Sequence, residues 1–159
     1  MITQAKANEL FEYKDGCLYW KVSRTPSIKV GQKAQTICEK SYKVTVNKKP
    51  YKVHRIIFLM HYGYMPKMID HIDGNPFNNK IENLRECTAQ ENNRNQKLAL
   101  RNTSGFKNVT WSKSAKKWQV GFMLSNNYKH IGTFEDIELA DLVAQEARDK
   151  YFGQFARHK

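Results

Sequence analysis

Hydrophobic and polar residues alternate along several short segments of the chain, and this period of two predicts half-buried β-strands. In the first part of the sequence the alternation covers residues 16–22 and 41–47. Residues 53–63 instead contain the apolar run IIFLM and are expected to form a short buried helix that ends at Gly63. Residues 1–66 are therefore expected to be rich in β-structure, with one helix.

The next segment shows the pattern of a strand, a loop, a second strand and a helix. Residues 67–71 are strand-like, the sequence GNPFNNK has the Gly, Pro and Asn content of a loop, and residues 81–87 can pair as a second strand. Thr88 and Glu91 then have the spacing of a capping box, in which the Thr caps a helix and the Glu reaches back. We expect that helix to run through residues 90–100.

The C-terminal part, after the linker-like sequence RNTSG, has the pattern of a small sheet covered by a helix. Strands are expected in FKNVTWSK, KKWQVGFML and YKHIGTF, with a hairpin turn at SNN before the last of them. A helix ending near Gly153 is expected at residues 137–151, with an apolar stripe made of Leu139, Ala140, Val143, Ala144, Ala147 and Tyr151. The helix would cover one face of a three-stranded antiparallel sheet and leave the other face free for a partner.

Length and charge limit what such an α+β chain can do. Its 159 residues suffice for one ordinary domain or two small ones, and we expect two, at residues 1–100 and 101–159. A net charge of +12 attracts polyanions such as DNA, RNA or an anionic membrane surface. A merely solvated basic surface, as on a ribosomal protein, is the simpler alternative. The run IIFLM is too short to span a bilayer, so no membrane partner is expected.

The three cysteines, Cys17, Cys38 and Cys87, include no CxxC pair. An odd number of scattered cysteines argues against a disulfide framework and against a structural zinc site. The N-terminal sequence has no apolar core of the secretory type. We therefore expect free, partly buried thiols and a cytoplasmic protein.

One short segment concentrates side chains that suit metal-dependent chemistry. Asp70 and His71 are neighbours at the end of an expected strand, so their side chains point to opposite sides. A hairpin that brings the following helix against this strand would let Asp70 and Asn92 supply two oxygens to one hard cation such as Mg²⁺. His71, on the other side, can take a proton from a water molecule. A base on one side and a cation on the other suit in-line attack on a phosphodiester.

The same residues carry a resemblance to a known family. The sequences IDHIDGNPFNNKIENL and TAQENNRN, with YKVHRIIF upstream, resemble the HNH (His-Me finger, ββα-metal) endonucleases over roughly residues 10–96. The similarity is greatest to the phage and intron-encoded subgroup, which has Asn in place of the last His. It implies a ββα-metal core at about residues 67–96, one bound Mg²⁺ or Mn²⁺ ion, and a bacterial host cell if the chain is of phage origin.

On that resemblance His71 is the general base, and Asp70 and Asn92 are the metal ligands. Asn83 corresponds to the middle Asn of the motif, which braces the loop that carries the base through backbone hydrogen bonds. The simpler alternative is that DHIDGN is an Asx-rich turn without catalytic function.

Other polar residues near the motif have ordinary roles open to them. Asn78, Asn79 and Asn93 are expected to be loop or surface amides. His54 is as readily a satisfied interior histidine as a functional one, and Arg55 is a candidate contact for a DNA phosphate.

The C-terminal sequence resembles the AP2 DNA-binding domain over almost its full length, in SGFKNV, the KW pair, HIGTF and the helix ELADLVAQEARDKYFG. Domains of that family lay their sheet in the DNA major groove, which admits a sheet as well as a helix. Plant members carry several Arg at base-reading positions, where this chain has residues such as Lys107, Thr110, Gln119, Met123 and His130. This departure implies a different or looser sequence preference. Candidate phosphate contacts, unless merely solvated, are Lys113, Lys116, Lys117 and Lys129.

Together these features predict a metal-dependent endonuclease of the phage or mobile-element type that acts on double-stranded DNA without an obligate protein partner. One catalytic centre cuts one strand at a time, so we expect a monomer that nicks, or that cuts both strands by reorienting or pairing. Homing is implied by the resemblance only. The alternatives are a non-catalytic DNA-binding regulator with a decayed nuclease fold, and an RNA-binding protein, which no RNA-type aromatic motif supports.

Overall fold

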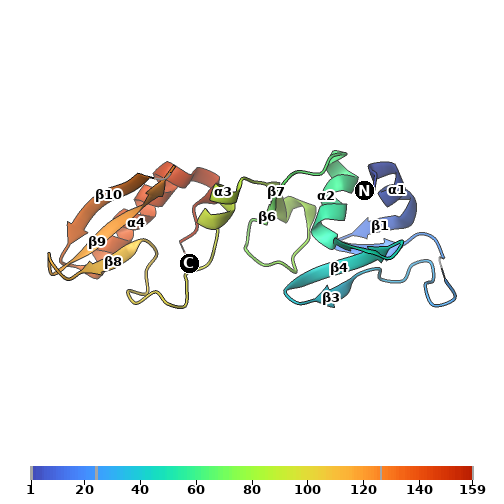
Figure 1. Cartoon of the computed structure of the whole chain (residues 1–159), viewed down its shortest axis with the longest axis horizontal. Helices are drawn as coiled ribbons and strands as arrows, with labels where there is room; N and C mark the ends of the chain where they lie inside the picture. Colours follow the sequence, from blue (N-terminus) through green and yellow to red (C-terminus); the bar gives the residue numbers. More distant parts are fainter. Residues whose placement is uncertain (1, 24, 126, 159) are drawn as a thin grey trace. The chain divides into compact units, whose positions relative to one another are not determined.

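The computed structural model describes residues 2–23, 25–125 and 127–158 as a mixed α/β protein. The backbone separates into two compact units, Met1–Ala89 and Gln90–Lys159, and each unit has its own small sheets and apolar core (Figure 1). The functional division expected at residue 100 is a prediction that this geometric division does not test. In the described ranges no helix is both long and apolar enough to cross a membrane.

The first unit is built from short strands in three antiparallel sheets and from two α-helices (Figure 1). Strand β1 pairs with β2, β4 lies between β3 and β5, and β6 pairs with β7. In chain order the elements are α1 (Gln4–Leu10), β1 (Phe11–Lys14), β2 (Cys17–Trp20), β3 (Thr36–Cys38), β4 (Ser41–Val46), β5 (Lys49–Lys52), α2 (Val53–Tyr62), β6 (Ile69–His71), the 3₁₀ turn η1 (Ile81–Asn83) and β7 (Leu84–Glu86).

Helix α2 forms the centre of the first core because most of its sequence, VHRIIFLMHY, is apolar. Five of its residues are buried against α1 and the sheets: Val53, Ile56, Ile57, Phe58 and Leu59. The helix ends at Gly63, whose φ of +79° is a left-handed conformation that glycine adopts without strain. The predicted end of this helix is therefore confirmed.

Helix α1 was not predicted from the hydrophobic pattern. The Thr3 hydroxyl caps it by accepting a hydrogen bond from the N–H of Lys6 at 3.2 Å. Only Ala7 and Leu10 are buried in its seven residues, so its helical period is too short to recognise in the sequence. The expectation of one helix in residues 1–66 is wrong for this reason.

Helix α3 (Ala89–Arg94) is shorter than predicted, because it ends at Arg94 instead of continuing through residue 100. The N–H of Gln96 donates to the carbonyl of Asn93 at 3.3 Å, which is the tight turn that often closes a helix. The asparagine-rich sequence ENNRN has low helix propensity, which explains the early end.

The second unit is a three-stranded antiparallel sheet with one helix packed on one face, as predicted (Figure 1). Its elements after α3 are β8 (Val109–Ser112), the central β9 (Lys117–Leu124), β10 (Asn127–Phe134), α4 (Ile137–Phe152) and the 3₁₀ turn η2 (Gly153–Phe155). Asp136 caps α4 by accepting the N–H of Leu139 at 2.7 Å. The turn predicted at SNN includes Asn126, which lies outside the described residues.

The core of the second unit is small, and its fully buried members are Val109, Val120, Ala140 and Ala144. The predicted stripe on α4 is correct for its alanines but wrong at its edges. Leu139 is 49% exposed, whereas Arg148 is only 1% exposed. The alanines let the helix approach the sheet closely, and a charged side chain takes a buried position that the apolar pattern gave no reason to expect.

Candidate functional site

The residues singled out in the first unit lie on the hairpin of β6 and β7. In its register Asp70 lies opposite Arg85, and His71 lies opposite Leu84. Asp70 and His71 are successive residues of one strand, so their side chains leave opposite faces. Both residues are buried, at 6% and 8% exposure.

Asn83, the residue before β7, holds the loop that follows His71. Its side-chain oxygen accepts the N–H of Asp73 at 3.0 Å, and its Nδ2 donates to the Asp73 carboxylate at 2.9 Å and to the carbonyl of Asn78 at 2.8 Å. The carbonyl of Asn83 also accepts the N–H of Ile72 at 2.9 Å. One buried residue thus fixes the loop at three points.

Asp73 organises the same loop from within, a function that the sequence pattern did not indicate. Its carboxylate accepts the N–H of Asn75 and the side-chain Nδ2 of Asn78, each at 2.7 Å. Partial burial of the carboxylate opposes ionisation, but these bonds and the one from Asn83 hold the pKa of Asp73 below its ordinary value. The ionised carboxylate therefore stabilises the loop conformation.

His71 contacts a second asparagine, Asn79, which lies in a loop as expected but is buried. Its Nε2 lies 2.9 Å from Oδ1 of Asn79, and Asn79 is 1% exposed instead of being a surface amide. An amide oxygen can only accept, so this contact places a proton on Nε2 and makes Nδ1 the basic nitrogen of a neutral His71 ring. Nδ2 of Asn79 has no hydrogen-bond partner among the described residues.

His54, on the first turn of α2, packs edge-to-face against His71 with ring centroids 5.1 Å apart. Burial lowers the pKa of His54 to about 3, and the nearby positive charges of protonated His71 and of Lys52 act in the same direction. His54 is therefore a neutral interior histidine near pH 7. Its place beside His71 could not be read from the sequence.

Asp70 forms a buried ion pair with Arg85. Nε and Nη2 of Arg85 donate to the same carboxylate oxygen, Oδ2, at 3.0 and 2.8 Å. Nothing in the sequence pattern indicated this role of Arg85.

Asn92 lies in α3 and belongs to the second unit, so its convergence with Asp70 on one cation stays a prediction. Within the described ranges no group of three or more His, Cys, Asp and Glu side chains is arranged to hold a metal. Cys17 and Cys38 are partly buried and Cys87 is buried, and none of these three described cysteines is in a disulfide.

The turn between β1 and β2 supports the candidate site from a distant part of the sequence. The hydroxyl of Tyr13 accepts the N–H of Ile81 at 3.0 Å, and Asp15 forms an ion pair with Lys80 at 2.8 Å. Gly16 has φ +79°, and a Cβ atom on it would lie only 2.9 Å from the backbone nitrogen of Lys80. The segment that carries Asn79 is thus packed directly against this turn.

In the second unit, three of the predicted DNA contacts lie together on the sheet face opposite α4. Thr110 pairs with Gln119 in register, and His130 pairs with Gly121, two residues further along β9. Nε2 of Gln119 lies 3.1 Å from Nδ1 of His130. Opposite residues of an antiparallel pair share a face, and here the residue between Gln119 and Gly121 points to the core.

The predicted lysine contacts are less uniform. Lys113 and Lys116 are exposed in the turn between β8 and β9, and Lys117 forms an ion pair with Glu135 at 3.1 Å. Lys129 is exposed, but its register partner is Phe122, so it leaves the sheet on the side of α4. It therefore does not share a face with Thr110, Gln119 and His130.

Arg55 and Lys107 both donate to backbone carbonyls. Nη2 of Arg55 donates to Pro66 at 2.8 Å, and Nζ of Lys107 donates to Gln96 and, at 3.2 Å, to Arg157. Each side chain thus ties segments of its own unit together. Contact of either one with DNA stays a prediction.

Comparison with known proteins agrees with the geometry of the first unit. The sequence model of the HNH_3 family, described as HNH endonuclease, matches residues 51–94, which include α2, the β6–β7 hairpin and α3. Members of this class of nuclease act on DNA and generally use a divalent metal ion. No solved structure matches the chain.

A relative of the chain is known from a bacterial virus. Protein 3.8 of Escherichia phage T7 is 40% identical over 101 residues, which cover 61% of this chain and 81% of the phage protein. The chain belongs to the family of this phage protein, and it carries an HNH endonuclease domain at residues 51–94. Neither comparison includes an AP2 domain.

Proposed function

We propose that the chain is a metal-dependent DNA endonuclease that hydrolyses phosphodiester bonds in duplex DNA. The observation that carries the proposal is the loop braced by Asn83, which holds His71 beside Asp70 inside the residues that match the HNH endonuclease family. His71 is the last residue of β6 and is followed directly by this braced loop, which suits a general base because the base must stay within hydrogen-bond distance of its water.

In this proposal His71 takes the proton of the attacking water at Nδ1. Asn79 acts as a positioning residue, because its oxygen holds the proton on Nε2 and fixes the orientation of the ring. Neutral His54 stands beside the ring without adding positive charge, so that His71 is not hindered from taking a proton.

Asp70 and Asn92 are the residues that would hold the divalent ion. A carboxylate and a carboxamide provide the oxygen ligands that Mg²⁺ and Mn²⁺ prefer, so the donor set fits one such ion, which completes its shell with waters. When bound, the ion stabilises the negative charge of the leaving oxygen. Arg85 orients Asp70 by binding its carboxylate oxygen Oδ2.

The second unit would position the enzyme on duplex DNA in the manner of an AP2 domain. Its open sheet face offers Thr110, Gln119 and His130 to base edges, and the exposed turn with Lys113 and Lys116 offers cations to phosphates. Phosphate contacts supply affinity that falls with salt, whereas base contacts set the preferred sequence. The known pairing of Gln with adenine makes Gln119 the first candidate for base recognition.

Cleavage of supercoiled plasmid and of genomic DNA from candidate hosts tests the proposal. The wild-type protein is expected to cleave with Mg²⁺ or Mn²⁺ and to stop when EDTA is added. His71→Ala should abolish cleavage and leave duplex binding within a few-fold of wild type, whereas His61→Ala, a change of the same type at an exposed position of the same unit, should leave both cleavage and binding close to wild type. Duplex binding without metal-dependent cleavage of any DNA would instead favour a non-catalytic regulator.

One catalytic centre per chain further implies nicking by a monomer. Open-circle plasmid should accumulate before linear plasmid, at a rate proportional to protein concentration. Concerted linearisation at low protein concentration, without an open-circle intermediate, would contradict this part of the proposal.

A further inference from the structure

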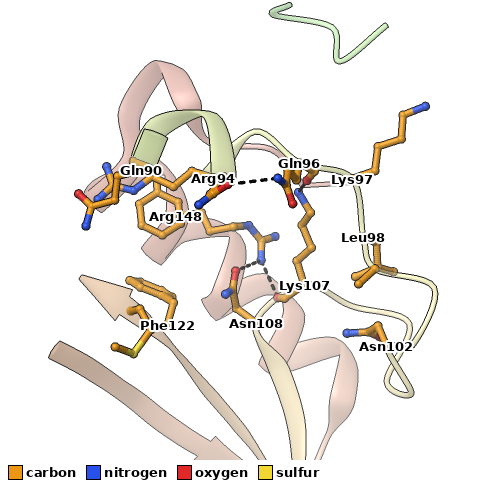
Figure 2. A pocket seen from close by; sticks show the side chains of 14 residues that line it. Gln90, Arg94, Gln96, Lys97, Leu98, Asn102, Lys107, Asn108, Phe122 and Arg148 are labelled. Carbon is orange, nitrogen blue, oxygen red and sulfur yellow. Dashed lines mark hydrogen bonds between the residues drawn. The ribbon is translucent and has the colours of Figure 1, made fainter. Parts of the chain in front are cut away.

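The second unit contains a pocket of about 520 Å³ that has no part in the proposed reaction (Figure 2). Four of its lining residues are cationic, namely Arg94, Lys97, Lys107 and Arg148. Among the described residues that line it none is acidic, and the others are mainly side-chain amides and apolar groups. We call this feature the cationic pocket. Its volume lies in the range of pockets that bind small ligands.

The most buried cation of the pocket is Arg148, which is 1% exposed. Its Nη1 donates to the carbonyl of Lys107 at 2.7 Å, its Nη2 lies 3.3 Å from Nδ1 of His158, and the carboxylate of Asp141 is 3.8 Å away. Nε of Arg148 has no hydrogen-bond partner among the described residues. The buried guanidinium keeps its positive charge beneath the wall of the pocket, and an anion in the pocket would offset that charge electrostatically.

Lys107 places a second positive charge in the same pocket. Its Nζ donates to two backbone carbonyls, which carry no formal charge and so leave the ammonium unneutralised. Burial, followed by the repulsion of Arg157 and Arg148, lowers the pKa of Lys107 to about 8. Cations held together at this cost are expected where an anion binds.

Arg94 adds a third cation above an aromatic ring. Its guanidinium carbon lies 4.7 Å from the ring centre of Phe152, which also packs on Phe122. A cation–π contact of this kind does not use the N–H donors of the guanidinium, which can still form hydrogen bonds to a ligand. Donors from α3, the segment before β8 and α4 therefore surround one space, as Figure 2 shows.

We propose that the cationic pocket binds a phosphate group of a nucleic-acid strand, held by Arg94, Lys97 and Lys107, with the buried charge of Arg148 adding to the positive potential. A phosphate offers several acceptor oxygens to donors that arrive from different directions, which a single carboxylate does not. The side-chain amides of the pocket then serve the sugar or base next to that phosphate. The four cations of the pocket have no role in the proposed chemistry at His71, so the proposal stands without nuclease activity.

The test is the pKa of Lys107, measured by NMR in the full chain with ¹³C-labelled lysine. Inorganic phosphate is added at constant ionic strength, with chloride as reference. Phosphate binding should raise this pKa by about one unit, which corresponds to about tenfold tighter binding to the protonated side chain. No change of the Lys107 pKa at saturating phosphate overturns the proposal.

Two double variants with the same loss of charge separate pocket binding from a general charge effect. Arg94→Gln with Lys97→Gln should weaken phosphate binding at least tenfold, whereas Lys40→Gln with Lys150→Gln, both outside the pocket, should leave it within twofold. Equal weakening in the two variants would contradict the proposal.

Short oligonucleotides identify the source of the phosphate. A trinucleotide with a 5′-phosphate and one with a 5′-hydroxyl are each added against bound inorganic phosphate. Competition by the first alone assigns the pocket to a strand end, and equal competition by both assigns it to backbone phosphates. If neither trinucleotide competes with inorganic phosphate, the ligand of the pocket is not a nucleic acid.

Discussion

The contact of His54 with His71 predicts how the first unit responds to acid. His54 is neutral in the folded protein because burial lowers its pKa to about 3 from an ordinary value of 6.5. The unfolded chain therefore binds one more proton than the folded chain between these two values. Since the folded pKa is depressed for a group that is charged when protonated, acid favours the unfolded state. Stability should be lost as the pH falls below 6.5, down to about 3.

The size of this loss follows from the two pKa values. In the unfolded chain His54 has its ordinary pKa of 6.5, so pH 5 lies 1.5 units below that pKa. Each unit corresponds to about 1.4 kcal/mol of unfolding free energy. Between pH 8 and pH 5 the first unit should thus lose about 2 kcal/mol of unfolding free energy through His54. This loss of about 2 kcal/mol depends only on the pKa of His54 in the unfolded chain, provided that folded His54 stays neutral at pH 5.

Comparison of the wild type with His54→Gln isolates this contribution. Urea unfolding at pH 8, 6 and 5, followed by pulsed hydrogen exchange and mass spectrometry, reports each unit through its own peptides. Between pH 8 and pH 5, the unfolding free energy reported by peptides of α2 and β4 should fall by about 2 kcal/mol more in the wild type than in the variant. Peptides of the second unit serve as an internal reference, and the exposed His61→Gln is the matched control on the same helix. An equal loss in wild type and His54→Gln would refute the assignment of His54 as a buried neutral group.

Three further predictions concern the neighbours of His71. Asn79→Leu should lower the cleavage rate by about tenfold or more, because supporting contacts of this kind commonly matter by 10–100-fold, and should change the melting temperature little, because the lost bond to His71 and the removal of the unsatisfied Nδ2 act in opposite directions; full activity would contradict a positioning role. Arg85→Leu should lower the unfolding free energy of the first unit by about 3 kcal/mol, because the buried carboxylate of Asp70 then loses its ion pair with Arg85, and Arg85→Lys should cost less in the same urea titration. Gly16→Ala should cost about 1–3 kcal/mol by thermal unfolding, since a Cβ would both occupy a left-handed position and press on Lys80, and an unchanged melting temperature would show that this turn yields freely.

Much of the fold could be predicted because its signals are local. Alternating apolar residues correctly indicated β2, β4 and the three strands of the second unit, and Gly63 marked the end of α2. Such signals depend on the residue itself and on neighbours within one or two turns. Helix α1 escaped prediction because its two buried residues gain their environment from α2, far along the chain.

The site was less predictable because burial of its polar groups depends on long-range packing. An asparagine in a loop is exposed by default, yet Asn79 is buried beneath the turn at Gly16. Lys107 was expected in a strand, but β8 begins only at Val109, after Asn108 with φ +64°. That left-handed residue lies between Lys107 and the strand. The side chain of Lys107 therefore does not lie along the sheet but reaches the carbonyls of Gln96 and Arg157. No pattern in the sequence reports such a change of direction.

The contact of the β1–β2 turn with residues 79–81 bears on how small a working nuclease fragment can be. The matched family segment begins at residue 51, yet Tyr13 and Asp15 hold Ile81 and Lys80 from outside it. A fragment trimmed to residues 51–94 would lose these restraints together with the apolar wall that Leu10, Phe11 and Leu18 supply to α2. A fusion of this nuclease to another protein must therefore include the N-terminal hairpin, since a segment more than sixty residues upstream holds the loop of the motif in place.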